Sequence, residues 1–297
     1  MIYELSHTTT YNYSDTVSLS HHLLRLQPRE LTRQHCQDVD LKVDPAPGSL
    51  RTQTDYFGNQ LTFVTVKGAH KRLTVAATSR VEVLATPPPS VEASPAWSLV
   101  RQQMLDQDPE LAMEAGEFLY DSPQISLIPA FQEYAQASFP AGRPVLAAAL
   151  DLTNRIYRDF KFDPKATTVA TPLTEVLKHR RGVCQDFAHL EIAFLRSMGI
   201  PARYVSGYLE TDPPPGKARL AGADASHAWL AFFCPGTGWI DLDPTNNLIP
   251  TNRHITLAWG RDYGDVSPIR GVILGSGEHS LKVAVDVIPA DEPRFRF

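Results

Sequence analysis

The sequence predicts an α+β protein in which a small antiparallel β domain precedes a larger domain of helices and strands. Three observations support this prediction. Apolar and polar side chains alternate with a period of two over residues 1–85, which indicates half-buried antiparallel strands. Residues 86–96 are rich in proline, which cannot continue a β-ladder and favours a stiff, extended linker. Residues 97–297 show helical patterns first and strand patterns afterwards, and we expect them to form the catalytic domain.

The N-terminal β domain is expected to contain about five to seven short strands, as in a small sandwich or barrel. A turn signal, YFGN at 56–59, separates two of these strands. Apolar and aromatic residues keep odd-numbered positions along the pattern: Tyr3, Leu5, Tyr11, Tyr13, Val39, Leu41 and Val43. His21 and His22 are adjacent on one predicted strand and point to opposite faces, so we expect structural roles for them and no shared metal ion.

The segment after the linker is expected to be helical and to lead into a buried central helix. A helix is predicted from Pro144 to about Tyr157, and a short helix opens at Thr171, where Pro172 has the backbone angle of a first helical position. Residues 182–199 carry apolar side chains on almost every face, which is typical of a buried helix. This helix is therefore the expected centre of the second domain.

Four strand patterns follow the central helix, at 202–209, 226–233, 239–243 and 280–289. Helix, strand, long loop and hairpin in this order predict an α+β core. The loop, residues 210–224, is long and rich in Pro and Gly, which makes it a candidate lid over a site.

Composition and charge exclude several classes of protein. Hydrophobic residues make up 43% of the chain and charged residues 21%, so wholesale disorder is ruled out. The net charge is −5 and no Lys/Arg-rich run occurs, which argues against a nucleic-acid partner. Three cysteines do not suggest a disulfide scaffold, and no apolar stretch is long enough to span a bilayer. The first residues lack the features of a signal peptide, so we expect a cytoplasmic protein with no membrane partner.

Cys184 stands at the predicted start of the central helix, a position that suits a nucleophile. Free backbone N–H groups and the positive end of the helix dipole stabilise a thiolate there, and Arg180 and Arg181 lie just upstream. The alternative is that Cys184 is a small core hydrophobe, as most free cysteines are. Cys234 begins a predicted turn, and we expect it to be structural.

His227 opens a predicted strand directly after the long loop, where a strand delivers a side chain to a cleft, although a lone strand histidine is often structural. A hairpin centred on Pro235 would place Asp243 directly opposite His227 on the same face. Asp241 lies on that face too, so the pattern leaves two candidates for an orienting carboxylate. With Cys184, these residues supply the nucleophile, base and orienter that thiol acyl transfer needs.

Four sequence blocks resemble the bacterial transglutaminase-like superfamily. They are GVCQDFA at 182–188, RSMGIPARYVSGY at 196–208, SHAW at 226–229 and GWIDLDPT at 238–245. The first 85 residues, with DYFGN at 55–59, are similar to the N-terminal β domain of many bacterial members. The resemblance implies a papain-like α+β core and the triad Cys184, His227 and Asp243. It prefers Asp243 to Asp241 because the family aspartate precedes a Pro-Thr pair.

The resemblance also implies thiol chemistry on amide carbonyls, with a peptide or protein as substrate and no cofactor. Bacterial members are more often assigned as peptidases than as cross-linking enzymes. We therefore expect a hydrolase that forms an acyl-enzyme, with acyl transfer to an amine as the alternative. A scaffold that binds a protein partner through the β domain is a further alternative.

Two features of the animal enzymes have no counterpart in this sequence. No calcium-loop pattern occurs, so we do not expect a calcium requirement. Their tryptophan upstream of the active-site cysteine has no evident equivalent either, which leaves the Cys184 backbone N–H as the expected oxyanion donor.

Other catalytic motifs do not occur in the sequence. It contains no G-x-S-x-G, no P-loop and no H-E-x-x-H. Cys184 and His189 are about 140° out of phase on a helix of 3.6 residues per turn, so we do not expect them to share a zinc ion. No metal site is therefore predicted.

Overall fold

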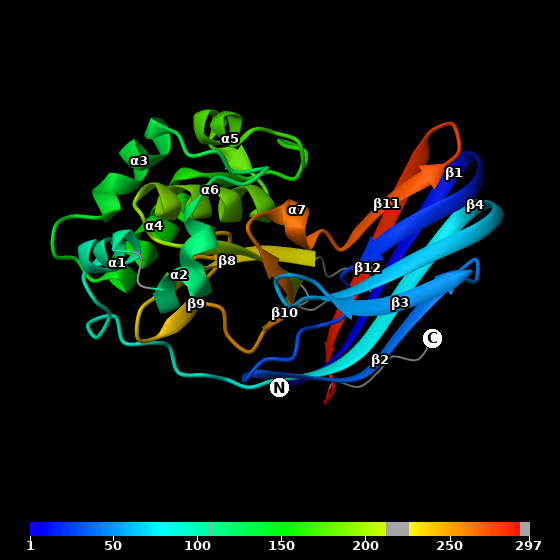
Figure 1. Cartoon of the computed structure of the whole chain (residues 1–297), viewed down its shortest axis with the longest axis horizontal. Helices are drawn as coiled ribbons and strands as arrows, with labels where there is room; N and C mark the ends of the chain where they lie inside the picture. Colours follow the sequence, from blue (N-terminus) through cyan, green and yellow to red (C-terminus); the bar gives the residue numbers. More distant parts are fainter. Residues whose placement is uncertain (107–108, 212–225, 292–297) are drawn as a thin grey trace, which may run out of the picture.

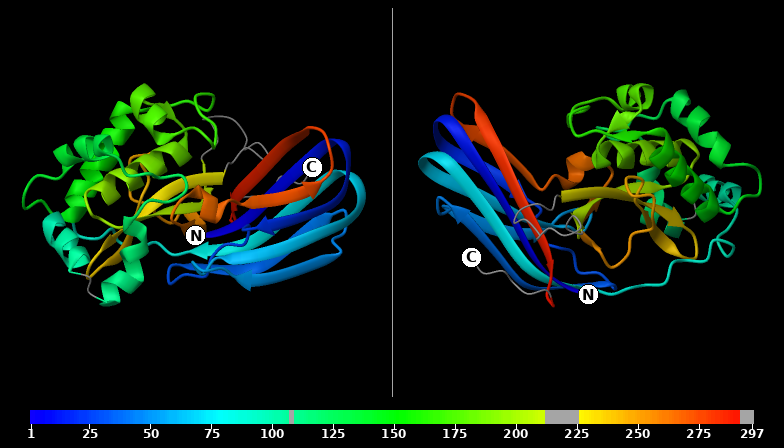
Figure 2. Two further views of the ribbon diagram at one scale, coloured as in Figure 1. Left: turned by 45° about the horizontal axis from the view of Figure 1, so that its top comes forward. Right: turned by 180° about the vertical axis from the view of Figure 1, so that it is seen from behind.

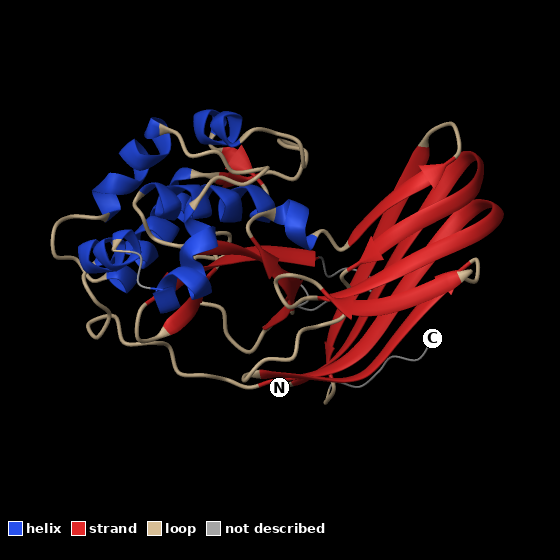
Figure 3. Ribbon diagram, in the orientation of Figure 1, coloured by secondary structure: helices blue, strands red, loops and turns tan. Residues whose placement is uncertain are grey.

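The computed structural model describes residues 1–106, 109–211 and 226–291, and it consists of two lobes (Figure 1). Residues 1–84 and 269–289 form a lobe of strands, which we call the β lobe. Residues 97–266 form a lobe with helices around a smaller sheet, which we call the mixed lobe (Figure 3). The predicted α+β class is confirmed.

The β lobe is one six-stranded antiparallel sheet built on two long strands. Its strands are β1 (Ile2–Leu24), β2 (Gln34–Asp44), β3 (Ser49–Thr54), β4 (Gln60–Val83), β11 (Ile269–Leu274) and β12 (His279–Pro289). The register between β1 and β4 shifts between Asn12 and Leu19. Val66 and Leu73 flank the irregularity on β4, yet both belong to one buried cluster. The sheet therefore folds over on itself into a sandwich-like domain, as predicted, but residues 1–85 supply four strands, two of them long, and the prediction of five to seven short strands is wrong.

The predicted alternation is confirmed in β1, where the odd-numbered residues from Tyr3 to Thr9 are buried and their neighbours are partly exposed. At this end of the lobe, Tyr3 and Leu5 share a buried cluster with the core of the mixed lobe. The two lobes accordingly lie against each other at one end and diverge toward the other (Figure 2).

The β lobe also takes up two strands from beyond the mixed lobe. β12 pairs with β1 from Tyr3↔Pro289 to Tyr13↔His279, and β11 pairs with β1 from Leu19↔Leu274 to Leu24↔Ile269. The predicted boundary assigned all of residues 97–297 to the catalytic domain, whereas the structure places β11 and β12 in the other sheet. A strand pattern shows that a segment is extended, but it does not show which sheet the segment joins.

The mixed lobe packs helices on a four-stranded antiparallel sheet of order β10-β7-β8-β9. Its helices are α1 (Trp97–Leu105), α2 (Pro109–Ala115), η1 (Gly116–Leu119), α3 (Pro129–Ala135), η2 (Gln136–Ser138), α4 (Val145–Asp159), α5 (Leu173–His179), α6 (Cys184–Ser197) and α7 (Tyr263–Val266). Its strands are β5 (Lys161–Phe162), β6 (Arg181–Gly182), β7 (Ala202–Leu209), β8 (Ser226–Cys234), β9 (Gly238–Leu242) and β10 (His254–Gly260). None of the helices in the described residues is long and apolar enough to cross a membrane.

The central helix α6 covers one face of this sheet. Leu230 and Phe232 of β8 share a buried cluster with α6, whereas Trp229 and Ala231 belong to a cluster on the opposite face. The sheet is therefore buried on both faces, which explains why its strands read as apolar runs without clear alternation.

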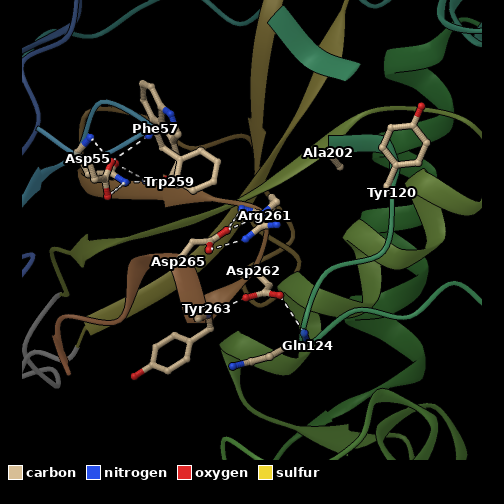
Figure 4. A network of polar contacts seen from close by, with 12 residues as sticks. Asp55, Phe57, Tyr120, Gln124, Ala202, Trp259, Arg261, Asp262, Tyr263 and Asp265 are labelled. Atoms are coloured by element: carbon tan, nitrogen blue, oxygen red, sulfur yellow. Dashed lines mark hydrogen bonds and ion pairs between the residues drawn. The ribbon is translucent and has the colours of Figure 1, made fainter. Parts of the chain in front are cut away.

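Two side-chain amides of the β lobe complete the edge of β10. Gln34 Nε2 donates to the Thr256 carbonyl at 2.8 Å, and Gln34 Oε1 accepts the Thr256 N–H at 2.8 Å. Asn59 makes the same pair of bonds with the backbone of Trp259, each at 2.9 Å. Asp55 Oδ1 in turn accepts the Asn59 N–H at 2.9 Å (Figure 4). The turn signal at 55–59 is therefore part of the contact between the lobes.

Arg196, in the last turn of α6, is buried and donates to three backbone carbonyls. Nε and Nη2 reach Ala202 at 3.0 and 2.8 Å, Nη1 reaches Tyr120 at 2.9 Å, and Nη2 reaches Arg261 at 2.7 Å. These acceptors come from three separate segments (Figure 4). The guanidinium thus ties the end of α6 to the chain around it.

Candidate active site

Cys184 is the first residue of α6, as the sequence predicts. The Val183 N–H donates to Asp186 Oδ2 at 2.8 Å, and the Thr167 hydroxyl donates to the same oxygen at 2.6 Å. Gly182 makes room for this carboxylate, because a Cβ at that position would lie 2.6 Å from Asp186 Oδ2. The start of the helix is therefore held in place, with the free N–H groups of its first turn beside the partly buried thiol.

His227 lies near the start of β8, opposite Gly207 of β7. Its Nε2 is 2.7 Å from Asp243 Oδ2, and the Cys184 side chain lies close enough to the ring to influence its pKa. Burial by itself would lower the pKa of His227, but the hydrogen bond to Asp243, the interaction with Cys184 and the charges of both groups raise it to about 10. The structure thus brings the three predicted side chains into one series, in the order Cys184, His227, Asp243.

Asp243 is fully buried, and both of its carboxylate oxygens accept hydrogen bonds. Oδ1 accepts the backbone N–H groups of Thr245 and Asn246 at 2.9 and 3.2 Å. Oδ2 accepts a hydrogen bond from Asn246 Nδ2 at 2.7 Å and is also hydrogen-bonded to the rings of His227 and His254. Burial alone would raise the pKa of Asp243, but the hydrogen bonds from the two histidines hold it well below its usual range. The carboxylate is therefore a fixed anion.

The register of the hairpin differs from the predicted one by two residues. Leu230 pairs with Leu242, so a hairpin centred on Pro235, with His227 opposite Asp243, is wrong. Asp243 follows the last residue of β9 and forms an isolated bridge with Leu248. The turn between these two residues, and not the ladder, directs the carboxylate to His227.

The two aspartates that the strand pattern left open have different partners. Asp241 pairs with Ala231 in the ladder and forms an ion pair with Arg33 of the β lobe, with 2.5 Å between Nη2 and Oδ2. It therefore contributes to the contact between the lobes, while Asp243 is the carboxylate beside His227.

Two residues of this cluster were missed by the sequence reasoning, namely Asn246 and His254. Asn246 lies in the turn after β9, and nothing in its local pattern separates it from other turn asparagines. His254 opens β10 as His227 nearly opens β8, so a histidine at the start of a second buried strand was the one available signal. Its Nε2 lies 3.1 Å from Asp243 Oδ2.

His227, Asp243 and His254 are also the group in the described residues whose donor atoms are close enough to hold a metal ion, within 4.8 Å of one another. Asp243 Oδ2 lies 2.7 and 3.1 Å from the two ring nitrogens, whereas a tetrahedral zinc ion with bonds of about 2.1 Å separates its ligands by about 3.3 Å. The distances fit hydrogen bonds between the ligands better than a shared ion.

A pocket of about 570 Å³ lies beside α6. It is lined by Gln185, Asp186 and His189 of the helix and by residues of the segments 123–131 and 169–174. Burial lowers the pKa of His189 to about 4, and its Nε2 accepts the Tyr263 N–H at 3.1 Å, so this ring is neutral. The predicted lid, residues 210–224, falls outside the described residues from 212 onwards.

The other two thiols have surroundings that disfavour ionisation. Burial and the Glu30 charge raise the pKa of Cys36 to about 11. Burial also raises the pKa of Cys234, which is fully buried at the end of β8 as expected of a structural residue. Both thiols therefore provide internal references for the reactivity of Cys184.

Comparison with known proteins gives two family matches. Residues 3–82 match the bacterial transglutaminase-like N-terminal region, and residues 132–244 match the transglutaminase-like superfamily. An uncharacterized protein of Mycobacterium tuberculosis is 42% identical over 295 residues, which cover 97% of this chain and 92% of that protein.

Two further similarities concern part of the chain and the whole fold. A protein-glutamine gamma-glutamyltransferase of Pseudomonas aeruginosa is 32% identical over 107 residues, 33% of this chain and 16% of that protein. A crystal structure of a candidate cysteine protease from Cytophaga hutchinsonii superimposes with a TM-score of 0.73 at 23% identity, over 100% of this chain and 94% of that one. At this identity the second similarity concerns the fold alone.

Proposed function

This chain belongs to the transglutaminase-like superfamily, and from that premise we propose that it is a thiol-dependent hydrolase of amide or peptide bonds. The observation that carries the proposal is the position of His227, which is hydrogen-bonded to Asp243 and lies close enough to Cys184 for the thiol to influence its pKa. This series supplies a nucleophile, a proton carrier and an anion that holds the imidazolium. None of these roles requires a cofactor.

In the first half of the proposed reaction, the Cys184 thiolate attacks the amide carbonyl carbon. The carbonyl oxygen becomes an oxyanion beside the start of α6, where the Cys184 backbone N–H and the helix dipole stabilise negative charge. The His227 imidazolium then gives its proton to the leaving amine, the C–N bond breaks, and a thioester to Cys184 remains.

In the second half, His227 takes a proton from a water molecule, which attacks the thioester carbonyl. The C–S bond breaks, the carboxylic acid leaves, and the thiolate returns beside the imidazolium. Asp243 keeps the ring of His227 in one orientation during both halves. We assign the acyl part of the substrate to the pocket lined by Gln185 and Asp186, the two residues that follow Cys184 on α6.

Transfer of the acyl group to an amine is the second candidate function. The observation that favours it is the similarity of a third of this chain to a protein-glutamine gamma-glutamyltransferase. The thioester and the proton carrier are the same in both reactions, and only the attacking group differs.

The first test measures the pH dependence of iodoacetamide alkylation at Cys36, Cys184 and Cys234 separately, by mass spectrometry. We expect Cys184 to be alkylated at lower pH than Cys36 and Cys234, and we expect His227→Ala to abolish this difference. Alkylation of Cys184 that follows the ordinary thiol curve would contradict the proposal and favour a binding role for the chain.

The second test separates hydrolysis from transfer. Peptide mixtures are incubated with and without a fluorescent primary amine, using the wild type, Cys184→Ser and the matched control Cys36→Ser. Cleaved peptide in both samples supports hydrolysis, whereas incorporation of the amine into a Gln-containing peptide supports transfer. Activity that survives in Cys184→Ser would exclude the thiol mechanism in either form.

A further inference from the structure

We propose that His254 is a positioning residue of this site, a neutral imidazole that holds the Asp243 carboxylate in the orientation that His227 needs. The inference rests on the proposed function, which it deepens by adding a fourth residue to the series. His254 does not act on the substrate; it acts through Asp243.

The contact between His254 and Asp243 is direct and buried. Nε2 of His254 lies 3.1 Å from Asp243 Oδ2, the same oxygen that lies 2.7 Å from His227 Nε2. The side chain of His254 is 2% exposed and that of Asp243 is 0% exposed. The two imidazole rings lie 5.9 Å apart between centroids. One carboxylate oxygen therefore bridges two histidines of different exposure.

The protonation of His254 follows from its surroundings. Burial lowers the pKa of His254, and although Asp243 and, more weakly, Asp241 raise it, the positive charge on His227 lowers it further. A neutral ring that bonds to an acceptor-only carboxylate must carry its hydrogen on Nε2. Its Nδ1 is then a lone pair, which is buried and has no hydrogen-bond partner among the described residues.

An unpartnered buried acceptor costs free energy that an apolar side chain at this position would not cost. The same position filled by an apolar ring would leave Asp243 Oδ2 without this donor. The bond to Asp243 is thus what the histidine contributes at this position. Such a locally unfavourable arrangement is typical of functional sites.

The fold fixes the ring of His254 from its other side. The indole of Trp229 meets it edge to face, with centroids 5.2 Å apart and an interplanar angle of 83°. Gly207 gives the indole its space, since a Cβ there would lie 2.4 Å from the Trp229 ring and 2.1 Å from the Ile255 carbonyl oxygen. His254 therefore has little freedom to turn away from Asp243.

For the proposed reaction, the role of His254 is to limit the movement of the Asp243 carboxylate. Asn246 and the turn after β9 hold Asp243 from one side, and His254 holds Oδ2 from within the sheet. Without His254 the carboxylate loses one of the three hydrogen bonds to Oδ2, and the His227 ring is held less firmly in its orientation toward Cys184. Small losses of alignment of this kind reduce the rate of the chemical step by about 10- to 100-fold.

The test compares His254→Phe, which keeps a planar ring without a donor, with His254→Gln, whose amide nitrogen replaces Nε2. The readouts are the rate of Cys184 alkylation by iodoacetamide at pH 6, the kcat and KM for a cleaved peptide, and the melting temperature. We expect His254→Phe to lower the alkylation rate and kcat by about 10- to 100-fold with KM unchanged, and His254→Gln to restore most of both. His22→Phe, which removes another buried histidine far from Asp243 in the β lobe, is the matched control and should leave thiol reactivity unchanged.

If His254→Phe does not fold, His254→Asn takes its place, because its amide is one carbon shorter and does not reach Asp243. Wild-type thiol reactivity in His254→Phe or His254→Asn would overturn the inference while leaving the proposed function intact. Equal loss in His254→Gln and the donor-less variant would overturn it as well, since the donor would then be irrelevant. If Cys184 of the wild type already reacts as an ordinary thiol, the proposed function fails, and the positioning role fails with it.

Discussion

The two ends of α6 both hold buried polar groups, but they use different partners. At its C-terminal end, Arg196 donates to backbone carbonyls, which cannot titrate or turn independently of the chain. At its N-terminal end, Cys184 lies beside His227, whose ring is hydrogen-bonded to the buried carboxylate of Asp243. The same helix thus has partners that cannot titrate at its C-terminal end and titratable side chains at its N-terminal end. The comparison teaches that a buried polar group bonded only to backbone is a structural support, whereas one bonded to titratable side chains is a candidate for a reactive site.

Removing the charge of Asp243 should have the largest effect, because it disables the titratable groups at the N-terminal end of α6 and leaves the C-terminal end unchanged. We expect Asp243→Asn to lower kcat/KM by about 10³- to 10⁴-fold, because the amide no longer holds an imidazolium, while the fold persists. Peptide-cleavage kinetics and far-UV circular dichroism measure the two effects. Asp241→Asn, which loses only the ion pair with Arg33, is the control, and its activity should stay within about threefold of the wild type. Comparable losses in both variants would show that the two carboxylates do not differ in role.

At the other end of the helix, we expect Arg196→Met to reduce the free energy of unfolding by about 3–5 kcal/mol. The carbonyls of Ala202, Tyr120 and Arg261 then lose a charged donor that water cannot fully replace. Denaturant titration measures the change, and thiol alkylation at low temperature shows whether the site survives. A stable Arg196→Met protein with an unreactive Cys184 would contradict this prediction, because Arg196 would then support the reactivity of the thiol and not the stability of the fold.

Between the two ends, Glu191 is fully buried, and its Oε1 accepts the Thr153 hydroxyl at 2.6 Å. Burial raises the pKa of Glu191 to about 8 from an ordinary value of 4.5. A raised pKa in the folded state means that this group favours folding fully below pH 4.5, and that the benefit is lost as the pH rises through 8.

We therefore expect the free energy of unfolding of the wild type to fall between pH 4.5 and 8 relative to Glu191→Gln. Each unit of the pKa difference corresponds to about 1.4 kcal/mol, so the gap should reach a few kcal/mol at pH 8. Guanidinium titrations of both proteins at several pH values provide the measurement. Parallel curves would mean that Glu191 has the same pKa in the folded and unfolded states, and they would contradict the raised pKa.

The contact between the lobes should give the smallest effect. Asn59→Ala leaves the N–H and carbonyl of Trp259 without their side-chain partner, and we expect a loss of about 1–3 kcal/mol. Gln53→Ala, at an exposed position on β3, controls for the loss of an amide side chain. Chemical denaturation and hydrogen exchange at Trp259 report the change. Unaltered exchange there would show that the amide does not protect the edge of β10.

Local features of the sequence were sufficient to predict α6, the place of Cys184 at its start and the alternation of β1. These depend on spacing within a single segment. The register of β8 and β9 was not predictable, because one-residue differences in a turn move every pair of the ladder. His254 was missed for a related reason: its partner, Asp243, follows β9, and β9 and β10 lie at opposite edges of the sheet, so neither local pattern shows that the two side chains meet.

Strand order also accounts for the assignment of residues 280–289. Their apolar alternation matched an antiparallel strand equally well in either lobe, and the pairing partner, β1, is separated from them by the whole mixed lobe. Nothing in the sequence of residues 280–289 identifies a pairing strand so far away along the chain. The prediction of a strand was therefore right, whereas the sheet to which it belongs required the structure.

The pairing of β1 with β12 also bears on how the protein is made. During synthesis β1 leaves the ribosome well before β12, which emerges only after the entire mixed lobe. Until then one edge of β1 is open along almost its full length, and such an edge can pair with other chains. Expression should therefore be most sensitive to changes that slow translation or folding before residue 269, even where they leave the finished protein unaltered.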